Sequence, residues 1–309
     1  MKTKSKFAVA AIALFVSQAA LAVNWNVDLN SKSPIDNKND DQYFGSFTYG
    51  GQTYGPKTAI AGENKRKVTR TTVNLAIFKE GQLYNPPQAN PQNNDKTKLG
   101  NNGSAGVNTN VTYRIYRQKH SGLIANVTKD RNNDTAYKNR NFVKHIVGDS
   151  TKLAALPASG IYKYKGTAFT NFPKGHFNYQ IDTAKKVGHG SFTLQSILVP
   201  GAWLKTKDNK FLDIAATLHT GKITAQKDGT LGVRNGNVTV NGVAGASFKN
   251  VADAKKAYAA VVANHKTANY GRVNPKYNIN LYGPKAEEVA GWVNGMPDRI
   301  GGVAIIGKR

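Results

Sequence analysis

The chain has 309 residues, with 43 lysines and arginines against 18 aspartates and glutamates, and its formal net charge is +25. A charge of this size favours acidic surfaces, polyanions and anionic ligands as partners. The sequence contains no cysteine, which excludes disulfides, thiolate metal sites, cysteine nucleophiles and lipidation of an N-terminal cysteine.

Residues 1–22 have the pattern of a secretory signal peptide. Three lysines among the first six residues precede a short apolar run, 7–16, and the small-residue stretch Ala-Leu-Ala ends at Ala22. The apolar run is too short to span a bilayer as a retained anchor, so the pattern predicts cleavage after Ala22. We therefore expect a mature chain that is secreted through the periplasm and is not embedded in a membrane.

Residues 23–152 are expected to form a β-rich N-terminal domain. Strands are predicted where β-branched and aromatic residues recur between clusters of Gly, Asn and Asp, in residues 43–49, 68–78, 111–116 and 142–147. Residues 85–110 are polar and rich in Gly, Asn and Pro, which predicts a long flexible loop. Such a loop is either a plain connection or a cover for a ligand.

The composition changes near residue 153, and residues 153–309 are expected to form a second domain. Short strands with tight turns predict an antiparallel meander, in residues 161–169, 176–182, 190–197, 222–226, 230–234 and 237–243. Closure of the meander into a barrel would remove its exposed edges. One helix is predicted over residues 253–265, with Asp253 as its N-cap and an apolar stripe at helical spacing.

Two of the few acidic residues, Glu287 and Glu288, are adjacent in the stretch LYGPKAEEVAG, residues 281–291. A catalytic carboxylate pair and a structural corner between two strands are the two interpretations. Neighbouring residues of a strand point to opposite faces, so the two carboxylates cannot easily converge on one substrate atom. The structural interpretation is favoured.

Four segments of the second half resemble the C-terminal barrels of a family of Gram-negative surface and secreted proteins. They are GIYKYKGTAF, GHFNYQID, LYGPKAEEVAG and DRIGGVAIIGKR. The family includes transferrin-binding protein B, factor H-binding protein and the hemophilins, and the resemblance covers roughly residues 155–309. It implies a mainly β fold, with an N-terminal β-rich ligand-binding domain and a C-terminal eight-stranded antiparallel β-barrel that carries one short helix.

The lipidated relatives carry a cysteine at the start of the mature chain, where this sequence has Val23. The chain therefore resembles the released members, the hemophilins, more than the anchored ones. That resemblance implies a hemophore for iron acquisition, which captures haem b and delivers it to a TonB-dependent outer-membrane haem receptor. It also implies export by a Slam-type, or type XI, exporter that reads the barrel.

Haem binding requires an axial ligand, which is usually histidine and sometimes tyrosine. Two of the six histidines lie in the N-terminal half: His120, at a turn after an aromatic strand, and His145, on a predicted strand. Either residue alone, or both together, would ligate the iron, and a surface or core histidine is the alternative for each. Tyr43 and Tyr49 are weaker candidate ligands.

Cations near these histidines are candidates to pair with the haem propionates, although each is individually typical of a solvated surface charge. They are Arg114, Arg117, Lys119 and Lys144. The other histidines lie at predicted turns or at the end of the predicted helix and are less suited to ligation: His176, His189, His219 and His265.

The sequence has no motif of a hydrolase, zinc protease, P-loop or dinucleotide-binding enzyme, so we expect a binding protein and not an enzyme. The alternative to haem capture is a secreted module that binds a host protein, as the transferrin- and factor H-binding relatives do. Nucleic-acid binding would require cations clustered with aromatic residues on one face. The basic residues are dispersed, and we expect no nucleic-acid partner.

Overall fold

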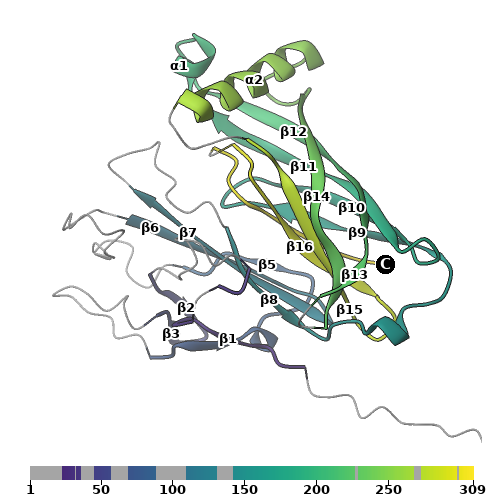
Figure 1. Ribbon diagram of the computed structural model, residues 1–309. Coiled ribbons are helices and arrows are strands. Elements are labelled where there is room, and N and C mark those ends of the chain that lie inside the picture. The colour runs from purple at the N-terminus through teal and green to yellow at the C-terminus, as the bar shows by residue number, and fades with distance from the viewer. Residues whose placement is uncertain are drawn as a thin grey trace, which may run out of the picture.

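The computed structural model describes residues 23–31, 33–35, 45–56, 69–87, 109–130, 142–226, 229–267, 273–297 and 299–309. The predicted signal peptide, most of the predicted loop 85–110 and Tyr43 lie outside these residues. The chain is mainly β, as expected, with a barrel in its second half and smaller sheets in its first half (Figure 1).

Eight antiparallel strands form the barrel. In sequence order they are β9 (Ile161–Phe169), β10 (Lys174–Asp182), β11 (Val187–Val199), β12 (Lys210–Lys222), β14 (Leu231–Val243), β15 (Lys276–Tyr282), β16 (Glu288–Asn294) and β17 (Val303–Lys308). The order around the sheet is β12-β11-β10-β9-β17-β16-β15-β14, and β12 pairs with β14 to close it. A two-residue strand, β13 (Thr224–Ala225), pairs beside β14. The prediction of an eight-stranded antiparallel barrel is confirmed.

Two details of the predicted strands were wrong. The predicted strands 230–234 and 237–243 form a single strand, β14, because a register shift between Val233 and Gly236 bends the strand without ending it. Strand β12 was missed over most of its length. Its sequence, KFLDIAATLHTGK, buries alternate residues, but the two adjacent alanines and the glycine near its end weaken the β signal.

Two helices lie at one end of the barrel (Figure 1): α1 (Gly201–Leu204) and α2 (Val251–Thr267). Helix α2 confirms the predicted helix and extends it by two residues at each end. The predicted N-cap was wrong, because Asp253 lies in the first turn and Asn250, whose Oδ1 accepts from the main-chain nitrogen of Asp253 at 2.8 Å, precedes the helix. Ala254, Ala257 and Val261 are buried against the barrel core, as the apolar stripe predicted. Among the described residues, no helix is long and apolar enough to cross a membrane.

The described residues of the first half form three small antiparallel sheets. One joins β1 (Asn26–Asp28) to β4 (Thr72–Asn74), and another joins β2 (Phe47–Tyr49) to β3 (Gln52–Tyr54). The third has the order β5-β6-β7-β8, with β5 (Leu83–Tyr84), β6 (Thr109–Arg117), β7 (Ser121–Asp130) and β8 (Val143–Gly148). The predicted strand 68–78 is limited to β4, because Asn74 caps a 3-10 turn, η2 (Leu75–Ile77), directly after it. A second such turn, η3 (Leu153–Ala155), lies between the halves.

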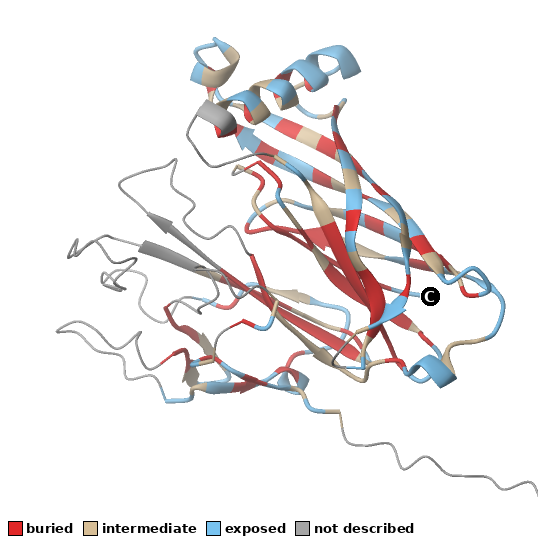
Figure 2. Ribbon diagram, in the orientation of Figure 1, coloured by how far each residue is buried: buried red, intermediate tan, exposed pale blue. Residues whose placement is uncertain are grey.

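The four-stranded sheet of the first half packs on both of its faces. One face contributes Tyr113, Ile115 and Ile124 to a core shared with the two small sheets. The other face contributes Leu123, Ala125 and Tyr116 to a second core, which contains outward-facing residues of the barrel. The barrel strands reflect this contact in Figure 2, because β15, β16 and β17 are buried over most of their length, whereas β10, β11 and β12 alternate between buried and exposed residues.

Candidate functional site

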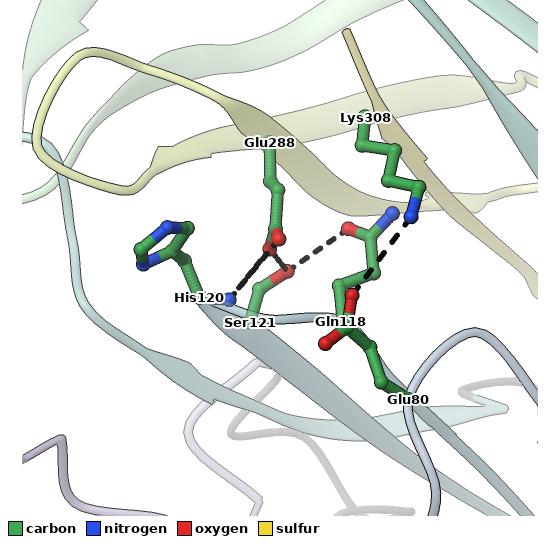
Figure 3. Close-up of polar contacts among 6 residues, drawn as sticks. All are labelled: Glu80, Gln118, His120, Ser121, Glu288 and Lys308. Carbon is green, nitrogen blue, oxygen red and sulfur yellow. Dashed lines mark hydrogen bonds and ion pairs between the residues drawn. The ribbon is translucent and has the colours of Figure 1, made fainter.

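The carboxylate of Glu288 joins the two halves of the chain (Figure 3). It lies at the start of β16, is 2% exposed, and its two oxygens are 3.1 and 3.0 Å from the main-chain nitrogen of His120. The hydroxyl of Ser121 donates to the same carboxylate at 2.8 Å. His120 ends the turn between β6 and β7, and Ser121 is the first residue of β7, so one carboxylate holds the tip of that hairpin against the barrel.

Burial raises the pKa of Glu288 above the ordinary glutamate value, while the hydrogen bonds from Ser121 and from the main chain of His120 oppose this rise. The neighbouring Glu287 has a different hydrogen-bond partner, since its carboxylate accepts from the main-chain nitrogen of Lys285 at 2.8 Å within the same turn. The two carboxylates therefore have separate structural partners. This geometry agrees with the structural interpretation of the pair.

The chain segment between the two halves adds main-chain contacts at the same corner. Thr151 donates from its main-chain nitrogen to Leu281 at 3.0 Å and from its hydroxyl to Gly283 at 2.7 Å. Gly283 in turn donates to the main-chain oxygen of Asp149 at 2.7 Å. The segment that leads into the barrel thus runs along the end of β15, and the corner is fixed from two sides.

A second contact between the halves is exposed and should contribute little. The amine of Lys308 lies 3.8 Å from a carboxylate oxygen of Glu80, and the side chains are 61% and 40% exposed, respectively (Figure 3). Solvent screens such pairs, and each long side chain loses freedom when it is held. We expect Lys308→Ala to change the free energy of unfolding by less than about 0.5 kcal/mol, as measured by urea denaturation. A loss above about 1 kcal/mol would show that the pair is more important than its exposure indicates.

His120 is partly exposed, and its imidazole packs against Gly283. A Cβ atom added to Gly283 would lie 3.1 Å from Cδ2 of the ring. The turn around Gly283 has a positive φ of 88°, a conformation that glycine adopts without strain. The ring of His120 therefore lies on the barrel side of the hairpin, and its assignment as a haem ligand stays a prediction.

His145 lies on β8, an edge strand of the four-stranded sheet, directly opposite Ile124. Directly opposed residues project to the same face, so its side chain lies on the face that carries Ile124, away from the barrel. Nδ1 of His145 is buried and has no hydrogen-bond partner. Burial lowers its pKa, which favours the neutral imidazole that binds metals. Its assignment as a ligand also stays a prediction.

The structure does not bring the two predicted histidine ligands together. His120 lies opposite Asp149, whose main-chain nitrogen donates to its carbonyl oxygen at 2.9 Å. Asp149 directly follows β8 and is four residues from His145, which corresponds to about 13 Å along an extended chain. Their rings lie toward opposite sides of the sheet. In this conformation, one iron cannot hold both, so the bis-histidine alternative does not fit the described structure.

The four predicted propionate contacts are also separated. Lys144 is 0% exposed, so it is a core residue and not a surface cation. Arg114 is 8% exposed and points toward the barrel, with its guanidinium 5.7 Å from the centre of the Phe169 ring. Arg117 points to the other face of the sheet, 5.0 Å from the Trp25 ring. Only Lys119 of the four is exposed, so the structure does not gather the four cations at one place, and their assignment as propionate contacts stays a prediction.

Tyr49 belongs to an aromatic cluster of the first half. Its ring centre lies 4.3 Å from that of Phe78 and 5.7 Å from that of Tyr84 in an edge-to-face arrangement. Burial, followed by the hydrogen bond with Tyr84, raises its pKa. This shift favours the neutral phenol over the phenolate that would bind iron. The other candidate, Tyr43, lies outside the described residues.

The barrel histidines do not form a ligand cluster. His176, His189 and His219 are exposed on the outer face, and His219 Nε2 lies 2.7 Å from the hydroxyl of Thr239. His265 is 7% exposed near the end of α2, so it is a core residue and not the exposed helix-end cation that the sequence indicated. Within the described ranges, no group of three or more His, Cys, Asp or Glu side chains is placed to hold a metal ion.

The barrel face opposite the first half is open and carries mostly uncharged polar side chains, with the half-buried Asp213 between Phe211 and Ala215 on β12 and with Lys165 of β9 at the edge of the face. One row crosses β10, β11, β12 and β14 through directly paired, exposed residues: Asn178, Ser191, Thr217 and Thr239. Further along β11 and β12, Leu198 lies opposite Phe211, and the two residues are 42% and 46% exposed. We call the surface from this apolar pair to the polar row the open face.

Sequence reasoning missed two residues of the junction. Glu288 was expected to form a corner, but its partner, the β6–β7 turn, is 167 residues away in the sequence. The only signal was a scarce acidic residue in a basic chain. Asn171, in the turn between β9 and β10, accepts from Arg114 Nη1 at its main-chain oxygen, at 2.7 Å. A single asparagine in a turn carries no signal of such a contact.

The barrel is similar to a known family. Residues 154–293, fewer than half of the chain, match the family model described as Factor H binding protein, C-terminal. Among solved structures, a double mutant of Transferrin Binding Protein B from Haemophilus parasuis is similar over 75% of this chain and 37% of its own, with 13% identity and a TM-score of 0.32. The chain thus spans well under half the length of that protein. No curated protein sequence matches it.

Proposed function

We propose that this chain is a secreted, non-catalytic binding protein that attaches to a host protein through its barrel. The observation that carries the proposal is the match of residues 154–293 to the C-terminal family of the factor H binding protein. The matched residues include the open face and the helices at the barrel end. Factor H is the partner that the family's description names, and it is the first partner to test.

The open face has the properties of a protein interface. The first half packs against strands on the opposite side of the barrel and leaves the open face uncovered (Figure 1). The eight outward positions of two adjacent rows carry no formal charge in a chain of net charge +25: Asn178, Ser191, Thr217, Thr239, His176, Thr193, Ala215 and Asn241. Interface centres are depleted in charged residues and enriched in aromatic ones, and the Leu198–Phe211 pair supplies an apolar anchor at one end.

Phe211→Ser is expected to weaken factor H binding at least about tenfold, because a partly exposed aromatic residue is a typical interface hot spot. Ile161→Ser is the matched control, since Ile161 is 61% exposed but lies at the start of β9, beyond the open face. The measurement is surface plasmon resonance of each variant against purified factor H. The proposal fails if the unmodified chain shows no saturable binding, or if both variants weaken it equally.

Haem capture is the second candidate function, and a specific feature of His145 supports it. A buried histidine normally pairs its ring nitrogens, but Nδ1 of His145 has no partner. Its lowered pKa keeps the imidazole neutral at physiological pH. We propose that His145, rather than His120, would ligate haem b. The accompanying proposals are transfer of the haem to a TonB-dependent receptor and export of the chain by a Slam-type exporter.

Titration of the chain with haemin is expected to give a saturable Soret shift that His145→Ala abolishes. His120→Ala is the matched control and should retain the shift, because its ring packs against Gly283. The measurement is visible absorption at fixed protein concentration, with a nonbinding protein as reference. Loss of the shift in His120→Ala alone would assign the ligand to His120, and the absence of a shift in the unmodified chain would eliminate haem capture.

A further inference from the structure

Arg114 is a buried cation that has no acidic partner among the described residues. It projects from β6 toward the barrel, and it is 8% exposed. Its Nε is buried and makes no hydrogen bond. In the part of the chain that the structure describes, its guanidinium forms no ion pair. Burial lowers the pKa of this group, because removal of a charge from water is costly when no opposite charge compensates.

Asn171 lies beside this guanidinium with an amide group that is also unpaired. Its main-chain oxygen accepts from Nη1 of Arg114 at 2.7 Å, yet its side-chain Oδ1 and Nδ2 are buried without partners. The residue is 8% exposed. Nearly all buried polar atoms in folded proteins are hydrogen-bonded, so three unpaired polar atoms on two neighbouring residues indicate that something outside the described protein atoms completes the group.

We propose that Arg114 and Asn171 form a binding site for a carboxylate group at the junction of the two halves. A carboxylate would accept from Arg114 Nε and from Asn171 Nδ2 and would neutralise the buried charge. Charge-assisted bonds from arginine to a carboxylate are among the strongest hydrogen bonds in proteins. The site is separate from the open face, so its failure would leave the proposed host-protein binding unaffected.

The surroundings indicate the kind of molecule that carries the carboxylate. The guanidinium lies 5.7 Å from the centre of the Phe169 ring, and the Phe142 ring meets Phe169 edge-on, with 6.0 Å between their centres. Phe172, next to Asn171 in the turn, is 64% exposed. One ring that faces the cation, a second ring that contacts the first, and an exposed ring next to Asn171 in the chain favour a carboxylate attached to an apolar or aromatic body. Its source is either a free organic acid or the carboxyl terminus of a bound protein.

The test follows the Arg114 Nε–H signal in ¹H–¹⁵N correlation spectra of the labelled chain during addition of benzoate or of N-acetyl-Gly-Phe with a free C-terminus. Benzamide and the C-terminal amide of the peptide are neutral controls, and sodium chloride controls for ionic strength. Arg117 is the internal reference, because its Nε is also buried and unpaired but lies on the other face of the sheet.

A saturable shift of the Arg114 signal with benzoate supports a free acid as the ligand, and a shift with the peptide acid alone supports a protein carboxyl terminus. Arg114→Met and Asn171→Ala should each weaken the binding at least about tenfold. Asn171→Ala keeps the arginine and so tests the site if Arg114→Met does not fold. No shift beyond that of the neutral controls, or an equal shift of Arg117, would overturn the proposal and leave water as the partner of these atoms.

Discussion

Glu288→Ala is expected to lower the free energy of unfolding by about 2–4 kcal/mol. The carboxylate is buried and accepts from the main chain of His120 and from the hydroxyl of Ser121. Alanine would leave the main-chain N–H of His120 without this acceptor, and the Ser121 hydroxyl would keep only its other contact, Gln118 Oε1 at 3.1 Å. A buried donor without a partner costs about 1–3 kcal/mol, and the loss of the charge-assisted bond from Ser121 adds about 1 kcal/mol. Urea denaturation of the full chain measures the change.

Glu288→Gln separates the acceptor from the charge. The amide oxygen still accepts from His120, and the variant no longer buries a charge, so we expect its free energy of unfolding to stay within about 1 kcal/mol of the unmodified chain at neutral pH. Lys308→Ala is the control for the same corner, because it removes the exposed contact with Glu80 only. A loss in Glu288→Gln as large as that in Glu288→Ala would contradict this account and assign the effect to the charge.

The pH dependence of stability follows from the raised pKa of Glu288. The folded-state pKa lies above the unfolded one, so the folded chain binds an extra proton between the two values. Stability from this group is therefore present below the unfolded pKa and is lost as the pH rises through the folded pKa. As the pH rises above about 4.5, the ordinary pKa of a glutamate, we expect the unmodified chain to lose stability relative to Glu288→Gln, whose side chain does not titrate. A difference that is independent of pH would contradict the raised pKa.

Tyr277→Ala is expected to cost about 3–5 kcal/mol of stability, as large aromatic truncations in cores do. The ring is 0% exposed inside the barrel, and its hydroxyl donates to the main-chain oxygen of His219 at 2.7 Å. It lies across β14, where the absence of a side chain at Gly236 makes room for it. A Cβ atom at Gly236 would lie 2.1 Å from Cε1 of the ring.

This contact predicts that the two positions are coupled. Gly236→Ala alone should cost about 1–3 kcal/mol through overpacking, whereas in the Tyr277→Ala background the added methyl group should cost less, because the ring it would meet is absent. Tyr277→Phe keeps the ring and should lose only about 1 kcal/mol through the hydroxyl. Calorimetric or urea unfolding of the four variants measures the coupling, and strictly additive losses would show that the ring and the glycine do not share one space.

The sequence alone was sufficient for the fold class and for much of the barrel. Alternation of apolar and polar residues is a local property of a strand, so β9 was predicted at its observed bounds and α2 to within two residues. The Gly-Pro corner and the face alternation of strands also led to a structural interpretation of Glu287 and Glu288. These conclusions depend only on neighbours a few positions apart, which a sequence displays directly.

The partners of the site residues were decided by tertiary structure. Lys144, Arg114 and Arg117 look alike in the sequence as cations near histidines, but one is in the core and the other two point to opposite faces of one sheet. His120 and His145 likewise lie toward opposite sides. The contacts of Glu288 with His120 and of Arg114 with Asn171 span 168 and 57 residues, respectively. They arise because the four-stranded sheet packs on the barrel, and no local pattern in the sequence encodes which surface meets which.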